Sequence, residues 1–520
     1  MKIKNITFAL VALAAAGFSS CGDFLDVKPA GKTIPETASE LEWLLNSDNT
    51  LDYMFMNNNR GSFYSMLGDN FEISPVQAAN YFTSSSGDLE YYAAYTFYKP
   101  YQNPNDLHYT WNWGIYRAVS VFNTVIEGVA DLKASEREST KATEIVAQAK
   151  AGRAWALMNG ALGYGPAYKK GGDNSTRVLP YRTIASADEP SPELSTMAQI
   201  FELALNDLDD ALAGAPAAVP NPSRASKAAV HALRAEYFMY AEEFDKMLYE
   251  ADQALTLSLA ANRNNFGALI YDYNLFSYIE GSPSGVPGVD DEVNWSLKYA
   301  DGDTDFNRAM ARENLFYRVS PRGAGAGSSA NNIYRYPSEE YLALFDPDTD
   351  RRYQLFALRN TGYGTDGIRR FYYRDYKTLP NQGITYPVLL LMRAEANVRA
   401  NGDLDSALAD LNTLRKYRYS GGDTDWKYEG SLTADMLLEE ILAERRREQP
   451  GSSFHRVHDL KRFAAYDQGK PWAKSSVTHT IGAQTYTSAV SEFTISLSNE
   501  VVRLNPQWGI APDTRTWAPK

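Results

Sequence analysis

Cysteine is almost absent from this sequence, since the 520 residues contain only Cys21. A single cysteine excludes a disulfide within the chain, a CxxC redox pair and a cysteine-rich zinc site. Positive charge is also in deficit, because 51 lysines and arginines face 64 aspartates and glutamates and leave a formal net charge of −13. An acidic chain of this size has no general electrostatic attraction to nucleic acid or to anionic lipid. No nucleic-acid partner is therefore expected.

Long apolar runs are missing too, and a mean hydropathy of −0.41 excludes a polytopic membrane protein. The apolar run at residues 8–18 is too short to cross about 30 Å of hydrocarbon, so residues 1–20 are predicted to be a signal peptide. Ser19 and Ser20 directly precede Cys21, an arrangement that resembles a bacterial lipobox. We therefore expect Cys21 to carry acyl chains, and ordinary signal cleavage beside a chance cysteine is the alternative.

Aromatic residues, in contrast, are abundant: the chain has 35 tyrosines, 22 phenylalanines and nine tryptophans. Residues 53–116 alone contain 17 of them among Gly, Asn, Ser and Pro, and residues 262–300 form a second aromatic, loop-like stretch. Flat rings with a polar edge suit the apolar faces of sugars, although packing of loops onto helices would use the same rings. The candidate ligand-binding residues are Tyr81, Tyr91, Tyr98, Tyr101, Trp111 and Trp113 in the first stretch, with Tyr271 and Trp295 in the second.

Trp111 and Trp113 differ in their relation to a predicted helix at 111–132. Apolar residues at Trp111, Ile115 and Val119 recur with helical spacing and define one face. Trp113 lies two residues from Trp111, so the two rings point in different directions. At most one of them is expected to be buried on that face.

Helical hairpins are the clearest structural signal. The segments 226–256 and 386–416 each show helical periodicity on both sides of a turn, near Glu242 in one and at 401–403 in the other. Both first helices contain Arg-Ala-Glu, and Ala251 and Ala407 let the second helix approach closely. Weaker hairpins are predicted near 145–213 and 434–465. We predict an all-α fold of tetratricopeptide-like helical hairpin repeats with long loop-rich insertions, in one domain spanning 21–520.

Motifs for catalysis or metal binding are few. The sequence contains no GxSxG, HExxH or Walker loop, so no enzymatic activity and no cofactor are predicted. The segments 301–305 and 346–350 space their aspartates as a calcium-binding loop does, but both lack the glycine that such a loop has at position 6. The segment 346–350 is interpreted as a turn. Calcium binding stays an alternative at either segment. The run 444–448 is interpreted as a charged helix face, and His455 and His458 as part of a solvated or salt-bridged helix.

Several segments together resemble the SusD/RagB family of outer-membrane nutrient-binding lipoproteins of Bacteroidetes. They are the run Cys-Gly-Asp-Phe-Leu-Asp-Val-Lys-Pro at 21–29, the helix start at 386–396 with Gly402-Asp403, the Leu-Asn-Thr-Leu-Arg segment at 411–415, and Ile-Leu-Ala-Glu-Arg-Arg-Arg-Glu at 441–448 followed by His455-Arg456 and 459–462. The sequence departs from the family pattern at 449–453, where relatives usually have Leu-x-Phe-Glu-Gly. This departure concerns local packing between the last two helices.

The resemblance implies a function. It implies a lipid-anchored protein of the outer membrane that faces the cell exterior, binds an oligosaccharide or polysaccharide, and passes it to a SusC-like TonB-dependent transporter. The lipid anchor is then the only contact with the membrane. Two alternatives stay open: a tetratricopeptide-like adaptor whose ligands are proteins, and a glycoside hydrolase, for which the many carboxylates nominate no particular pair.

Overall fold

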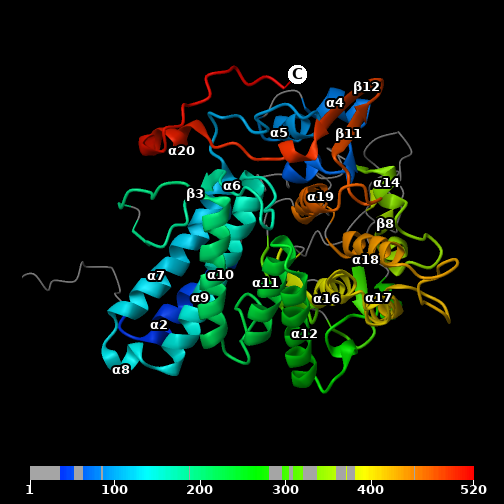
Figure 1. Ribbon diagram of the computed structural model, residues 1–520, viewed down its shortest axis with the longest axis horizontal. Helices are drawn as coiled ribbons and strands as arrows, with labels where there is room; N and C mark the ends of the chain where they lie inside the picture. The colour runs from blue at the N-terminus through cyan, green and yellow to red at the C-terminus, as the bar shows by residue number, and fades with distance from the viewer. Residues whose placement is uncertain are drawn as a thin grey trace, which may run out of the picture.

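The protein is described here by a computed structural model (Figure 1). It describes residues 35–51, 63–82, 86–186, 188–279, 296–303, 309–319, 336–358, 370–371, 381–449, 451 and 453–519. The predicted signal peptide, Cys21 and Trp295 lie outside these residues, as does the side chain of Tyr81.

Most of the regular structure is helical. The N-terminal part contains α2 (Ala38–Glu42), α3 (Asp48–Leu51), α4 (Pro75–Tyr81), α5 (Ser86–Tyr95), α6 (Tyr109–Trp111), α7 (Arg117–Asp131) and α8 (Ala134–Arg137). The scaffold consists of α9 (Thr140–Tyr164), α10 (Met197–Gly214), α11 (Lys227–Tyr240), α12 (Phe244–Ala261), α16 (Tyr386–Asn401), α17 (Leu404–Arg418), α18 (Ala434–Glu448) and α19 (His455–Tyr466). Three short helices complete the set, α14 (Glu339–Leu342), α15 (Arg351–Phe356) and α20 (Asn499–Leu504).

Strands form only short antiparallel pairs in the described part of the chain. The pairs are β1 (Phe71–Glu72) with β7 (Tyr336–Pro337), β2 (Arg177–Leu179) with β3 (Ser195–Thr196), β4 (Phe276–Ile279) with β5 (Ser296–Tyr299), β6 (Asn314–Phe316) with β10 (Ile384–Thr385), β8 (Ala357–Leu358) with β9 (Arg370–Phe371), and β11 (Ser476–Ile481) with β12 (Gln484–Ala489). The predicted fold class, helical hairpins with loop-rich insertions, is confirmed.

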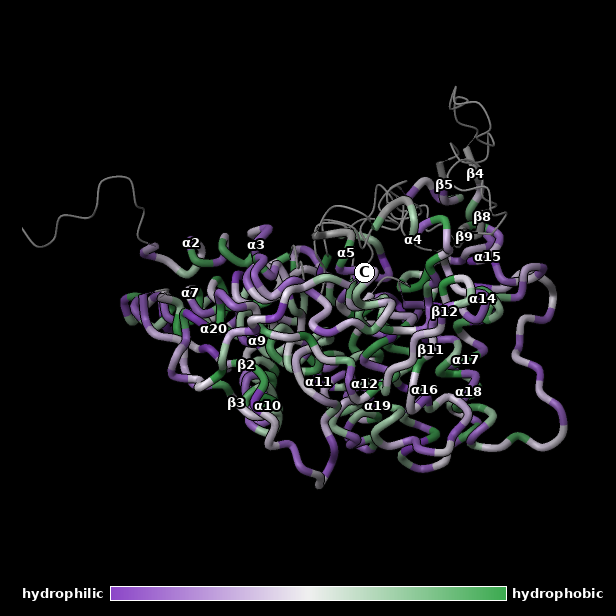
Figure 2. The backbone as a smooth tube through the Cα atoms, turned by 90° about the horizontal axis from the view of Figure 1, so that it is seen from above, coloured by the Kyte–Doolittle hydropathy of each residue, from purple (hydrophilic) through white to green (hydrophobic). Residues whose placement is uncertain are grey.

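The scaffold helices pack in sequence order. Helix α9 contacts α7 and α10, α11 contacts α12, and α12 contacts α16, which in turn contacts α17 and α18 (Figure 1). Seen from above, hydrophobic and hydrophilic residues are interspersed along the scaffold helices (Figure 2). Helices α9, α11 and α16 are buried along most of their length, as the inner helices of stacked hairpins are.

Local sequence explains where the hairpin helices begin and end. Ser226 caps α11 by accepting a hydrogen bond from the backbone N–H of Ala229, and Thr385 does the same for α16. Helix α16 ends at Gly402, whose φ of +69° is the left-handed conformation that glycine adopts without strain. Asp403 then caps α17.

The Arg-Ala-Glu motif shared by both hairpins has a structural role. Arg234 Nε donates to Glu250 Oε1 of α12 at 2.7 Å, and Arg393 Nε donates to Asp410 Oδ2 of α17 at 2.9 Å. In each hairpin the motif arginine therefore joins the first helix to the second. A charge-assisted hydrogen bond of this kind fixes the register between the two helices.

The interpretation of 444–448 as an ordinary charged helix face is wrong. Glu444 is fully buried, and Arg445, Arg446 and Arg447 are between 2% and 7% exposed. Of the two interpretations of the helix that contains His455 and His458, the salt-bridged one is confirmed, since Arg462 pairs with Asp459 and Arg456 with Asp69. The solvated one is wrong, because both rings are buried. These side chains lie inside because α19 is covered by α5 and β11 and α18 lies next to α14 (Figure 1). Arg446 of α18 donates to Asp69 and to Glu340 of α14.

Buried charges are paired, as the cost of desolvation demands. Glu444 accepts hydrogen bonds from Arg352 Nη1 and Arg447 Nη2, both at 2.6 Å. Glu395 of α16 accepts from Arg462 Nη1 of α19 at 2.6 Å and from Arg399 Nε at 2.8 Å. These pairs tie the last two helices of the scaffold to its middle.

Two further expectations concern membranes and calcium. No helix in the described ranges is long and apolar enough to cross a membrane.

The segment 346–350 forms the expected turn. The carboxylate of Asp346 accepts hydrogen bonds from the Thr349 hydroxyl at 2.8 Å and from the Asp348 N–H at 2.9 Å. Asp301 and Asp303 of the other segment both accept from Arg312.

Candidate functional site

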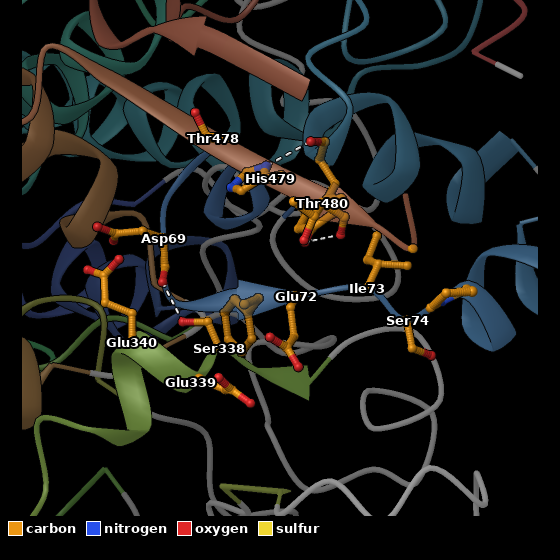
Figure 3. Close-up of a pocket in the computed structure, with 14 residues that line it drawn as sticks. Asp69, Glu72, Ile73, Ser74, Ser338, Glu339, Glu340, Thr478, His479 and Thr480 are labelled. Carbon is orange, nitrogen blue, oxygen red and sulfur yellow. Dashed lines mark hydrogen bonds between the residues drawn. The ribbon is translucent and has the colours of Figure 1, made fainter. Parts of the chain in front are cut away.

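A pocket of about 370 Å³ lies between the N-terminal segment, α14 and β11 (Figure 3). Its lining comes from residues 69–75 around β1, from Tyr95 at the end of α5, from residues 338–340 and from residues 478–482. The lining carries hydroxyls and carboxylates together with the half-buried ring of Phe71, whereas Tyr95 is 2% exposed. Such a surface can exchange hydrogen bonds with a polyhydroxylated ligand, and the Phe71 ring can pack against an apolar face.

One wall is formed by joining two distant parts of the chain. Strand β1 pairs with β7, so that Phe71 lies opposite Pro337. Just beyond β7, the Ser338 hydroxyl donates to the Asp69 carbonyl oxygen at 2.6 Å, and the Ser338 N–H donates to the Asn70 carbonyl at 2.9 Å. The Ser338 oxygen also accepts from the N–H of Tyr341 and so caps α14. One serine thus fixes both the wall and the helix that follows it.

The opposite wall is strand β11. Its residues alternate between exposed and buried, which places the side chains of Thr478 and Thr480 outward and that of His479 inward. His479 Nδ1 lies 2.7 Å from the Tyr95 carbonyl oxygen, and its Nε2 lies 2.9 Å from the Gly68 carbonyl oxygen. The Tyr95 hydroxyl donates to the Thr480 carbonyl at 3.1 Å. These bonds hold β11 against α5 and leave both threonines at the pocket.

Asp69 is the electrostatic centre of the pocket's inner end. Its carboxylate accepts from Arg456 Nε at 2.7 Å, from Arg446 Nη2 at 3.0 Å and from Lys474 Nζ at 2.7 Å. Burial alone would raise the pKa of Asp69, but the positive charges of these three side chains hold it well below its usual range. Asp69 is therefore an ionised, fixed acceptor and has no proton to give as a general acid.

Four of the sequence-predicted ligand residues are buried in the structure. Tyr91, Tyr101, Trp111 and Tyr271 are at most 7% exposed. The Trp111 ring packs against Tyr116, Tyr164 and Trp508 with centroid separations of 4.7, 5.4 and 6.2 Å. Tyr91 and Trp111 lie on α5 and α6, and all four rings belong to the hydrophobic cores. They are therefore used for packing, which is the alternative role stated for these aromatic residues.

Hydrogen bonds occupy the polar ends of two of these buried rings. The Tyr101 hydroxyl donates to the Glu492 carbonyl at 3.2 Å. The Tyr271 hydroxyl donates to Asp303 at 2.7 Å, and the Arg312 guanidinium lies 4.4 Å from the centre of the Tyr271 ring. Their ring faces and hydroxyls are thus used within the protein.

Trp113 and Tyr98 are the predicted residues that stay accessible in the described part of the chain. Trp113 is 40% exposed and packs edge-on against Tyr109 at 5.2 Å, whereas Trp111 is buried. The expectation that at most one of the two tryptophans is buried is confirmed. Tyr98 is half-buried. Neither Trp113 nor Tyr98 lines the pocket, so the structure does not bring the predicted aromatic residues together at one site.

Sequence reasoning missed most of the pocket. Phe71 and Tyr95 belong to the aromatic stretch 53–116 but are not among the predicted ligand-binding residues. The predicted ligand-binding stretches do not include residues 338–340 and 478–482. The alternation of small polar and apolar residues at 476–481 was a usable signal for a half-buried strand. This alternation does not indicate which segment of the chain lies opposite the strand in the pocket.

Comparison with models of protein families matches residues 291–499 to the SusD family. The resemblance of the chain to the SusD/RagB family is confirmed over these residues. No curated protein matches the sequence. The family assignment therefore rests on the family match, the motifs at 386–396 and 441–448, and the fold.

Solved structures of SusD-like proteins share this fold. A SusD superfamily protein from Bacteroides thetaiotaomicron is 17% identical, with a TM-score of 0.65 over 90% of this chain and 98% of that one. A SusD-like carbohydrate binding protein from Bacteroides vulgatus is 16% identical, with a TM-score of 0.60 over 91% and 97%. A SusD superfamily protein from Bacteroides fragilis is 18% identical, with a TM-score of 0.62 over 91% and 99%. At these identities the comparison concerns the fold.

Proposed function

We propose that the protein is a cell-surface glycan-binding lipoprotein that captures oligosaccharides and passes them to a partner SusC-like TonB-dependent outer-membrane transporter. The observation that carries the proposal is the pocket between β1, α14 and β11, which is lined by hydroxyls, carboxylates and the half-buried ring of Phe71. The match of residues 291–499 to the SusD family supports the same assignment. So does the similarity in fold to a SusD-like carbohydrate binding protein from Bacteroides vulgatus.

The proposal includes binding and no catalysis. Glycoside hydrolysis uses one carboxyl group that keeps a proton to give and a second that is ionised. Asp69 cannot supply that proton, because Arg446, Arg456 and Lys474 keep it ionised. Calorimetry of the Cys21→Ala chain against oligosaccharides tests the binding. Saturable heat without released product supports it, silence across the panel favours a protein adaptor, and released product favours a hydrolase.

The lipid anchor and the transporter are part of the proposal. Acyl chains on Cys21 each contribute on the order of 0.8 kcal/mol per buried CH₂, enough for a multiply acylated terminus to hold the protein on a membrane. Cys21→Ala is expected to move the protein from the membrane fraction to the soluble fraction after a carbonate wash. Co-purification of a tagged wild-type chain from outer membranes with a TonB-dependent barrel, identified by mass spectrometry, tests the partnership.

A further inference from the structure

Tyr95 forms the floor of the pocket and joins its two walls. Its hydroxyl donates to the Thr480 carbonyl oxygen of β11 at 3.1 Å and also hydrogen-bonds to the backbone of Ile73, which directly follows β1. Tyr95 itself is 2% exposed. A glycan in the pocket therefore has no way out through the floor.

The inner end of the pocket is closed by Lys474, which lies just before β11. Its Nζ donates to Asp69 Oδ2 and to both carboxylate oxygens of Glu340, each at 2.7 Å. Asp69 belongs to the β1 wall and Glu340 to α14, so one ammonium group joins all three parts of the chain that line the pocket. A chain of sugars can pass this end only if these ion pairs break.

The opposite end is closed by contact between the two walls. The turn between β11 and β12 lies against Pro75, the first residue of α4. A Cβ atom on Gly482 of this turn would lie 3.4 Å from Cγ of Pro75, an ordinary van der Waals distance. A sugar ring does not fit through such a gap. Figure 3 shows Asp69 and Glu340 at one end of the pocket and Ser74 at the other.

Two closed ends make this site different from a binding groove. A polysaccharide that binds through an internal segment needs two exits, because its chain continues in both directions. The residues that the structure describes leave one opening, on the side opposite Tyr95. The volume of about 370 Å³ lies near the lower end of the range for small-molecule sites, about 300–1,000 Å³, and suits a few terminal sugar residues.

We propose that this pocket binds the end of a glycan chain, and that the ion pairs of Lys474 form the stop that the chain end meets. The inference rests on the proposed function and adds which part of the glycan the same site takes. Lys474 is then a specificity-determining residue. The hydroxyls of Thr478 and Ser338 lie along the walls, where they can exchange hydrogen bonds with the terminal sugar residues.

The first test compares glycans of the same repeating unit with and without ends. Calorimetry is carried out with linear maltohexaose against cyclomaltohexaose, and with linear against cyclic β-1,2-glucan. In each pair that binds, the linear glycan is expected to bind at least ten-fold more tightly, because the cyclic one has no end to insert.

A second test removes the influence of ring shape. Hexamers and polymers of β-1,4-mannan and β-1,4-xylan are titrated, and the number of protein molecules bound per polymer chain is measured. Binding at chain ends is expected to keep this number at two or fewer, whatever the length of the polymer. Binding to internal segments would make the number grow in proportion to length.

The variant Lys474→Ser removes the stop and leaves two arginines paired with Asp69. It gives the glycan a second exit, so we expect more protein molecules per polymer chain and a smaller difference between linear and cyclic glycans. Lys470→Ser is the matched control, because Lys470 pairs with Asp435 on the surface at 2.7 Å, outside the pocket lining. This control is expected to behave as wild type. Urea denaturation checks that both variants are folded.

The outcomes separate the inference from the proposed function. Cyclic glycans that bind as tightly as linear ones, or a number of bound molecules that grows with polymer length, overturn binding at chain ends and leave glycan binding standing. A folded Lys474→Ser variant that behaves as wild type overturns the role of Lys474 as the stop. Absence of binding by every glycan of both tests overturns the proposed function and the inference with it.

Discussion

The imidazole of His479 lies parallel to the ring of Tyr95, with centroids 4.2 Å apart and an angle of 4° between the planes. Phe97 stacks on the other side of the same imidazole at 4.7 Å. Because His479 belongs to β11 and Tyr95 to α5, this stack joins the C-terminal hairpin to the N-terminal segment. It holds β11, which is one wall of the pocket, against the end of α5.

That arrangement predicts how the pocket can be closed. Thr480→Tyr places a ring on the exposed face of β11 at the pocket, so we expect glycan affinity to fall at least ten-fold. Ser476→Tyr makes the same change on the same strand and face, four residues or roughly 13 Å away, and is expected to leave affinity unchanged. Calorimetry measures both, and both variants should unfold within about 0.5 kcal/mol of wild type. Equal affinities for the two variants would place the glycan elsewhere.

The fold could be predicted from the sequence to a much greater extent than the site. Helical periodicity and capping are local, so the hairpins at 226–256 and 386–416 are visible in short windows. The pocket depends on Ser338 reaching Asp69, 269 residues earlier, and on His479 reaching Tyr95, 384 residues earlier. Nothing in either segment alone indicates its partner.

Trp111 and Trp113 show the same limit of prediction from local sequence. Spacing predicted that they point apart, but only packing decides which one is buried. Trp111→Ala removes a ring held among Tyr164, Trp508 and Tyr116 and is expected to lower the free energy of unfolding by about 3–5 kcal/mol.

Trp113→Ala serves as the matched comparison. Its ring is 40% exposed, so the loss is expected to stay near 1 kcal/mol or less. Urea denaturation followed by circular dichroism measures both. Similar losses for the two variants would mean that the burial of Trp111 does not reflect its contribution to stability.

His458 shows why the burial of α19 was not predicted from the sequence. Its ring is buried among Tyr64, Tyr240 and Phe454, and neither ring nitrogen makes a hydrogen bond within the described part of the chain. Burial lowers the pKa of His458 well below its usual value, and the charge of Lys461 lowers it further. A pattern of charges along a helix does not reveal that the helix lies inside.

The lowered pKa gives an acid dependence with a definite sign. Below the unfolded-state pKa near 6.5, the unfolded chain takes up a proton at His458 and the folded chain does not, so stability is lost as pH falls. His458→Phe removes this contribution. Relative to wild type, the variant is expected to gain about 2 kcal/mol in free energy of unfolding between pH 7.5 and pH 5. Urea denaturation at several pH values measures the gain; parallel curves for both proteins would contradict it.

The glutamates of the two Arg-Ala-Glu motifs, Glu236 and Glu395, have pKa values shifted in opposite directions. Glu395 accepts hydrogen bonds from Arg462 and Arg399, whereas Glu236 Oε2 makes no hydrogen bond among the residues that the structure places. Burial raises the pKa of Glu236 to about 7. In the case of Glu395, burial is outweighed by the charges of Arg462 and Arg399, which lower its pKa. The same residue at the same motif position thus keeps its proton up to about pH 7 in one hairpin and is ionised in the other.

Substitution of each glutamate by glutamine is therefore expected to change the free energy of unfolding in opposite directions at pH 8. Between about pH 4.5 and 7 the folded chain keeps the Glu236 proton and the unfolded chain releases it, so stability falls as pH rises through that window. Glu236→Gln imitates the protonated form; it should match wild type near pH 5 and exceed it by about 2–3 kcal/mol at pH 8. Glu395→Gln leaves buried arginines without their counter-charge and should cost about 3–5 kcal/mol at pH 8. Urea denaturation of both variants and of wild type at pH 5 and pH 8 measures these differences. A loss of stability in Glu236→Gln at pH 8 would mean that the Glu236 carboxylate is ionised and paired in the folded chain.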